Sequence, residues 1–133
     1  MASELVNLWL DNWRPPGYNT DMATVYAQTL ERISENVPLR HEDVARIVGA
    51  SVRSVSRWAR GETGPRGKAR ERLLELSAVV KQLSKVLTPD AAEAWLFTPN
   101  PALDFERPVE LLHSGDYKRV LAAIEGLEDG VFV

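Results

Sequence analysis

The sequence predicts an all-α fold, with a helix-turn-helix DNA-binding domain followed by a small helical C-terminal domain. Three observations support this prediction. Apolar residues recur at helical spacing in nearly every segment, and no stretch alternates as a strand does. Residues 41–60 fit the pattern of a repressor-type DNA reader. The apolar content of the 133 residues is 44%, which is normal for a chain that buries a core.

Two helices are expected before the reader. Residues 3–13 place apolar side chains on one face, and the run Pro15-Pro-Gly17 ends that element. This leader helix either binds a partner or packs on the protein's own core. A second helix is expected over about 21–36, and its inward face would be formed by Met22, Val25, Tyr26, Leu30 and Ile33.

The reader segment, residues 41–60, is the most specific pattern in the chain. Ala45 is small where two helices of a helix-turn-helix approach most closely, and Gly49 supplies the positive φ of the turn. Ser51 suits the N-cap of the second helix. The remaining core positions of the motif require apolar side chains, and they hold Val44, Val48, Ala50, Val55 and Trp58.

A long helix is expected next, over about residues 66–87. Its inward face would be formed by Leu73, Leu76, Val80, Leu83 and Leu87. Thr88 is a good N-cap and Pro89 a good first helical residue, so a further helix is expected from there through Trp95.

The end of the chain is expected to hold two short helices after an irregular turn. The turn is predicted by Pro99-Asn-Pro101, because proline restricts both its own backbone and the residue before it. The helices are expected over about 108–113 and 116–125, with Gly126 as the C-cap of the second.

The second reader helix and the residues after it present basic and hydroxyl side chains. Arginine can bind guanine through two hydrogen bonds in the major groove, and serine can contact base edges or phosphates. The basic residues that follow suit phosphate contacts. The alternative is a helix-turn-helix fold that has lost DNA binding. The predicted DNA-binding residues are Ser51, Arg53, Ser54, Arg57, Arg60, Arg66 and Lys68.

The distribution of charge agrees with a centre that binds a polyanion. Residues 40–85 carry a net charge of +6, although the whole chain has −3. The flanks are acidic, with −3 over residues 1–39 and −6 over residues 86–133. An acidic flank avoids nucleic acid or binds a basic partner. Uneven solvation of helix faces is the alternative explanation.

The composition excludes several classes of protein. The chain has no cysteine, which excludes disulfide scaffolds, thiolate zinc sites and cysteine nucleophiles. No apolar run reaches the length of a membrane span and no secretory leader is present, so we expect a cytoplasmic protein without membrane contact. No phosphate loop, metal-ligand cluster or nucleophile elbow occurs, so we expect no enzymatic activity, no metal and no cofactor.

The C-terminal segment carries a second specific pattern. Its runs are Trp95-Leu-Phe-Thr-Pro-Asn-Pro-Ala-Leu103, Arg107-Pro-Val-Glu-Leu-Leu112, Tyr117 to Ile124, and the final Gly130-Val-Phe-Val133. Together with the preceding reader, these runs resemble the Xre/MbcA/ParS family of type II antitoxins, and the MbcA branch most closely. The resemblance covers about residues 22–133 and leaves residues 1–21 outside.

The resemblance implies an antitoxin that neutralises a RES-domain toxin, an enzyme that destroys NAD, by obstructing its active-site cleft. It also implies a homodimer that represses its own operon, and a larger hetero-oligomer with the toxin. For Trp95 and the prolines we favour a structural role, in the core and in the turn, over partner contact. For the tail, docking on the protein's own helices is the alternative. The predicted toxin-binding residues are Trp95, Pro99, Asn100, Pro101, Glu128, Asp129, Gly130, Val131, Phe132 and Val133.

We therefore divide the chain into a leader at 1–21, a DNA-binding domain at 22–86 and a toxin-binding domain at 87–133. The alternative function is a plain helix-turn-helix repressor whose C-terminal domain only dimerises. The acidic C-terminal region with its apolar tail favours the antitoxin.

Overall fold

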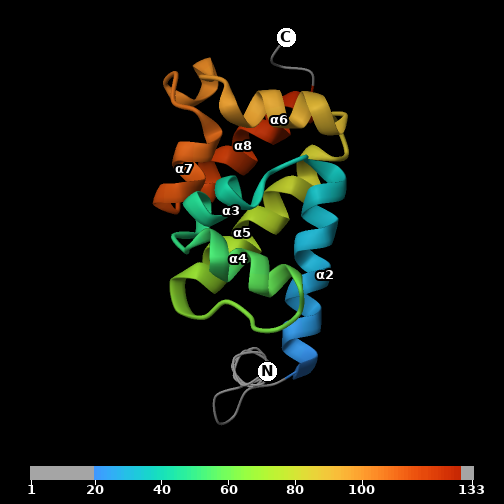
Figure 1. The fold of residues 1–133 in the computed structure, drawn as a ribbon. Helices are drawn as coiled ribbons and strands as arrows, with labels where there is room; N and C mark the ends of the chain where they lie inside the picture. The colour runs from blue at the N-terminus through green and yellow to red at the C-terminus, as the bar shows by residue number, and fades with distance from the viewer. Residues whose placement is uncertain (1–19, 130–133) are drawn as a thin grey trace, which may run out of the picture.

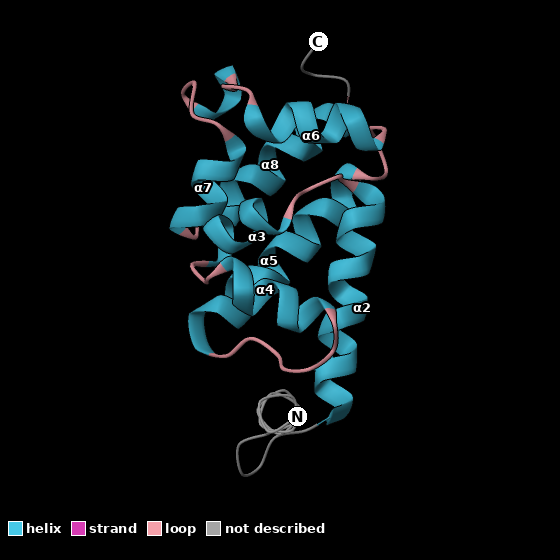
Figure 2. Ribbon diagram, in the orientation of Figure 1, coloured by secondary structure: helices cyan, strands magenta, loops and turns pink. Residues whose placement is uncertain are grey.

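The structure is a computed structural model that describes the backbone of residues 20–129 and the side chains of residues 22–129. Within that range, the regular elements are seven α-helices and one short 3-10 helix (Figure 2). The all-α prediction is confirmed. The expected leader helix and the tail residues 130–133 lie outside the described residues.

The first described helix, α2 (Thr20–Asn36), is amphipathic, but its buried face begins later than the apolar spacing suggests. The spacing places Met22 and Val25 on the inward face, whereas both side chains are exposed. The reason is visible in Figure 1, where the first turns of α2 project beyond the helices that it packs against. The buried face is formed by Ala23, Tyr26, Leu30 and Ile33.

The reader segment forms two eight-residue helices, α3 (His41–Val48) and α4 (Val52–Ala59), joined by a three-residue turn. Gly49 has a φ of 75° and its N–H donates to the carbonyl of Ala45 at 2.9 Å. The Ser51 hydroxyl accepts the N–H of Ser54 at 3.0 Å and so caps α4. This is the arrangement that the reader pattern predicts.

The long helix, α5 (Gly67–Leu83), ends four residues before the expected limit at residue 87. Residues 84–87 form a turn, and Thr88 then takes an extended backbone with ψ of 162°. The residue before a proline is disfavoured in the helical region, so the chain leaves the helix before Pro89. The Thr88 hydroxyl accepts the N–H of Ala91 at 3.4 Å, as expected of an N-cap.

Three helices and a 3-10 turn complete the described chain. They are α6 (Pro89–Phe97), η1 (Pro101–Leu103), α7 (Pro108–Ser114) and α8 (Tyr117–Glu128).

The prediction that Gly126 ends the last helix is wrong. The helix α8 continues to Glu128, and the N–H of Asp129 donates to the carbonyl of Glu125 at 3.0 Å. A glycine inside a helix costs only about 1 kcal/mol relative to alanine. Packing of the half-buried Leu127 beyond the glycine offsets that cost.

The core is one continuous cluster of buried side chains, and α5 runs through its centre. The helix α5 packs on α2 and α3 and also on α7 and α8. The side chains of α5 that are almost completely buried are Leu73, Leu76, Val79, Val80 and Leu83. The reader helices and the C-terminal helices therefore share a hydrophobic core.

Within the described residues, the two sets of predicted site residues lie at opposite ends of the molecule. In Figure 1, α4 and the loop that joins it to α5 occupy the lower part of the view. The helix α6, the segment between α6 and α7, and the end of α8 occupy the upper part.

Candidate functional site

At the lower end, α4 presents the candidate DNA-contacting side chains. Val55 and Trp58 point into the core and anchor the helix. Arg53 lies on the opposite, exposed face. Ser54 is half-buried, and its hydroxyl accepts a hydrogen bond of 3.0 Å from the hydroxyl of Ser51. The two serines are therefore engaged in the helix cap, which leaves Arg53 as the most accessible predicted base contact of the helix.

Glu62, which the sequence analysis did not single out, binds two of the predicted DNA-contacting arginines. Its carboxylate lies 2.9 Å from Nε of Arg60 and 3.4 Å from Nε of Arg57. The Arg57 side chain is only 30% exposed, less than expected of a residue that reads a base. The hydrogen bond from Arg60 is the largest cause that lowers the pKa of Glu62, so this carboxylate is firmly charged.

The other predicted cations stand at the start of α5. Arg66 is the N-cap residue of that helix and Lys68 lies in its first turn, and both are exposed. The helix start and the loop from α4 lie at the same end of the molecule as α4 (Figure 1). Phosphate contacts require only accessible positive charge near the groove, so this position suits them.

At the upper end, Asn100 holds together the loop between α6 and α7. Its N–H donates to the carbonyl of Glu106 at 3.1 Å, and its carbonyl accepts the N–H of Leu103 and of Phe105, each at 2.9 Å. Its side-chain Oδ1 accepts the N–H of Ala102 at 2.9 Å. Asn100 is thus a structural residue of this loop, whether or not it contacts a partner.

The other predicted toxin-contacting residues differ in accessibility. Pro99 and Pro101 are exposed on either side of Asn100. Trp95 is half-buried and packs against the core, which agrees with its expected structural role. The acidic residues at the end of α8, Glu128 and Asp129, are exposed, and the tail they lead into lies outside the described residues.

Arg119 of α8 fastens the same loop by two of its three ion pairs. Its guanidinium lies 3.3 Å from a carboxylate oxygen of Asp104 and 3.3 Å from one of Glu106, and 3.5 Å from Asp116 on its own helix. Phe105 lies between these two acidic residues in sequence and is 72% exposed. Sequence reasoning missed this residue; the only signal was an isolated aromatic between two acidic residues.

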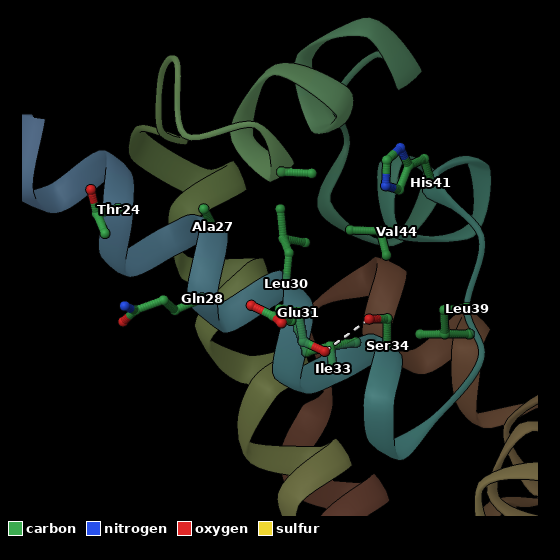
Figure 3. Close-up of a pocket in the computed structure, with 11 residues that line it drawn as sticks. Thr24, Ala27, Gln28, Leu30, Glu31, Ile33, Ser34, Leu39, His41 and Val44 are labelled. Atoms are coloured by element: carbon green, nitrogen blue, oxygen red, sulfur yellow. Dashed lines mark hydrogen bonds between the residues drawn. The ribbon is translucent and has the colours of Figure 1, made fainter.

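A pocket lies between α2 and α3, at the side of the reader (Figure 3). Its wall is mostly apolar, with Leu30 and Ile33 from α2 and Val44 from α3. Glu31 and His41 add polar groups at its edge. None of the residues predicted to bind DNA or toxin lines it.

Two other kinds of site receive no support from the described part of the chain. Residues 20–129 contain no group of three or more acidic or histidine side chains placed to hold a metal ion. No helix in the same range is long and apolar enough to cross a membrane.

Comparisons with known proteins agree with the fold described above. Residues 82–130 match the family described as the antitoxin Xre/MbcA/ParS C-terminal toxin-binding domain. Over 109 residues the chain is 42% identical to the mycobacterial cidal antitoxin MbcA of Mycobacterium tuberculosis, covering 82% of this chain and 96% of the relative. The chain belongs to the Xre/MbcA/ParS antitoxin family. The match of residues 82–130 includes the Asn100 loop, Arg119 and the acidic end of α8.

Further relatives of this antitoxin family support the assignment. A probable mycobacterial cidal antitoxin of M. tuberculosis is 38% identical over 91 residues, which is 68% of this chain and 77% of that protein. The crystal structure of the M. tuberculosis MbcT–MbcA toxin–antitoxin complex contains a chain with 42% identity and a TM-score of 0.73. That match covers 80% of this chain and 96% of the other, so the likeness extends through both halves of the fold.

Proposed function

We propose that this chain is the antitoxin of a type II toxin–antitoxin system, which binds a RES-domain, NAD-degrading toxin and blocks its active site. The observation that supports this most strongly is the 42% identity, across nearly the whole of the relative, to a chain crystallised in a toxin–antitoxin complex. The proposed role is binding rather than catalysis. The cognate toxin is the RES-domain protein expected from the neighbouring gene.

The proposed inhibitor is the tail, Gly130-Val-Phe-Val133, which follows the exposed acidic residues at the end of α8. An enzyme that binds a dinucleotide needs positive groups for its phosphates. Glu128 and Asp129 match that charge, and Phe132 supplies an apolar anchor.

We also propose that the chain binds operator DNA through α4 and represses its own operon as a dimer. The short turn between α3 and α4, the exposed Arg53 and the +6 charge of residues 40–85 support this. Half-sites about one helical turn (~34 Å) apart, or a multiple of that, are expected for a dimeric reader of this class.

The toxin half of the proposal is tested by deleting residues 130–133. The truncated chain should fail to rescue the growth of cells that express the toxin, while it binds operator DNA as the full chain does. Rescue is measured at matched expression, and operator binding by gel shift. If the truncated chain protects as well as the intact one, the tail is not the inhibitor.

The DNA half is tested by Arg53→Ala, which should weaken operator binding by about 1–3 kcal/mol if the side chain reads a base. Lys81→Ala is the matched control, because Lys81 is an exposed cation in the last turn of α5, far from α4 in the chain. The Arg53 variant should still rescue cells from the toxin. Unchanged operator affinity of this variant, at physiological salt, would refute α4 as the reading helix.

A further inference from the structure

Phe105 is the most exposed of the large apolar side chains that the structure describes. Its exposed fraction is 72%, against 47% for the next, Leu74 on α5. Aromatic side chains dominate the binding energy of many protein interfaces, so a ring exposed to this extent is a candidate anchor where its loop is rigid. The ring lies within the residues that match the toxin-binding domain of the family.

The backbone that carries this ring is held in an unusual conformation. Asp104 and Phe105 have φ values of 55° and 64°, and they are the only residues other than glycine with positive φ in the described range. A bulky residue rarely adopts this left-handed region, and such strain persists only where the surroundings enforce it. Aspartate tolerates this region, but Phe105 at the tip of the loop does not, so its backbone needs a strong local frame.

That frame is present on both sides of the ring. Asn100 accepts the N–H of Phe105 and bonds across the loop to Glu106, which closes the base of the turn. Arg119 of the neighbouring α8 lies 3.3 Å from the carboxylates that flank Phe105 in sequence. The ring is thus presented by a loop that is closed and braced before any partner arrives, which lowers the entropy cost of binding.

The charge around the ring indicates the chemistry of the partner. The Asp104 side chain is 93% exposed and that of Glu106 is about half-exposed, so the ring stands between accessible carboxylates. One guanidinium serves both of them and also Asp116, and Arg107 of the loop is itself paired with Glu110, so acidic side chains outnumber basic ones around the ring. A complementary surface has an apolar pocket with basic groups at its rim.

The position of the loop fits the same partner as the tail. The segment between α6 and α7 and the end of α8 lie at the upper end of the molecule, away from α4 (Figure 1). A protein that receives the tail would therefore face this loop as well, and would leave the reader helix accessible.

We propose that Phe105 is a second anchor for the toxin, and that its ring enters an apolar pocket on the toxin with basic groups around the entrance. This inference rests on the proposed antitoxin function. In this proposal the loop holds the toxin, and the tail blocks the toxin's cleft.

The test compares the full-length wild type with Phe105→Asn and Leu74→Ala for binding to the purified RES-domain protein encoded by the adjacent gene. Asparagine tolerates the left-handed backbone, so it removes the ring and keeps the loop. Leu74→Ala removes the next most exposed apolar side chain, outside the loop. We expect the dissociation constant of Phe105→Asn to rise roughly tenfold or more, with Leu74→Ala and the operator affinity of both variants unchanged.

A second measurement does not depend on any variant. Hydrogen exchange of the wild-type peptide that covers residues 99–107 should slow when the RES-domain protein is added. Binding of Phe105→Asn within about twofold of the wild type, or no added protection of that peptide, would overturn the inference while the antitoxin function stands. If the wild type itself does not bind the RES-domain protein, the proposed function is wrong, and the proposed anchor is wrong with it.

Discussion

At the scale of single residues, Glu62 determines how much positive charge the reader presents. Its carboxylate lies within ion-pair distance of both Arg57 and Arg60, and so competes with phosphate for these two guanidinium groups. A bound operator must either displace this contact or accept arginines that are partly neutralised. The reader is therefore weaker in electrostatic attraction than its count of arginines suggests.

We expect Glu62→Gln to raise operator affinity severalfold, because it removes the carboxylate charge that lies against both arginines. The salt dependence should steepen by roughly one unit of slope for each further phosphate that an arginine neutralises. Affinity is measured by fluorescence anisotropy from low to physiological salt. A variant whose affinity and salt slope match the wild type would show that neither arginine approaches the DNA backbone.

The same substitution has a pH signature. The folded state lowers the pKa of Glu62 below its ordinary 4.5, chiefly through the hydrogen bond from Arg60. Its stabilising effect is thus fully present above pH 4.5 and is lost as the pH falls through the lowered value. The free energy of unfolding of Glu62→Gln should lie less than about 1 kcal/mol below the wild type at neutral pH, and the gap should close in acid.

Local chemistry explains which residue roles could be predicted from the sequence. Ser51, Thr88 and Gly49 act as expected, because a cap or a turn depends on its own few neighbours. The backbone of Phe105 could not be predicted, since no glycine or asparagine marks its left-handed conformation. The pairing of Arg57 with Glu62 depends on how the chain returns from α4, which helical spacing does not record.

At the scale of elements, the glycines of two turns differ in the room available for an added Cβ, and so in the stability lost when each is replaced by alanine. Gly49, after α3, has a φ of 75° and open space where a Cβ would stand. Gly115, after α7, has a φ of 90°, and a Cβ there would lie 2.5 Å from a guanidinium nitrogen of Arg72. That guanidinium is itself paired with Glu75 at 3.4 Å, so moving it breaks a contact.

Gly115→Ala should therefore destabilise the protein more than Gly49→Ala. Gly49→Ala has only the backbone penalty of a left-handed residue, about 1–2 kcal/mol. Gly115→Ala also displaces Arg72 from a half-buried ion pair. Urea denaturation of both variants gives the comparison. Equal losses of stability would mean that Arg72 moves aside without cost.

The extent of the elements was less predictable than their existence. Each helix expected within residues 20–129 is present, because buried faces impose a helical period on the sequence. The errors are at ends, where α5 stops at Leu83 and α8 passes Gly126. There, the choice depends on the cap of the next helix and on tertiary packing rather than on the residue at the boundary. The division at residues 86 and 87 stays a prediction.

At the scale of the whole molecule, the two halves are joined by polar contacts as well as by the core. Arg46 of α3 lies 2.6 Å from a carboxylate oxygen of Glu110 on α7. The carbonyl of Arg46 lies 2.6 Å from Nδ1 of His113, near the end of α7. These contacts help to orient α3 relative to α7. The main stabilisation of the two halves is the burial of apolar side chains of α5 against both of them.

A fragment of residues 84–133 should consequently fail to fold by itself. It contains α6, α7 and α8 but lacks the buried leucines of α5 on which α7 and α8 pack. Far-UV circular dichroism should show little helix, whereas a fragment that begins at residue 66 and retains α5 should be more helical. A cooperative thermal transition of the shorter fragment would show that the C-terminal helices need no support from α5.

Because α5 packs on both the reader helices and the C-terminal helices, recombination is a limited route to new combinations of operator and toxin specificity. A crossover that joins the reader of one antitoxin to the toxin-binding helices of another divides a single hydrophobic core wherever it falls near this helix. Such a hybrid must repack the contacts between α5 and whichever set of helices comes from the other protein. Exchange of whole genes, or substitution at the exposed ends, preserves the core, and we expect divergence of partner choice within such a family to follow those routes.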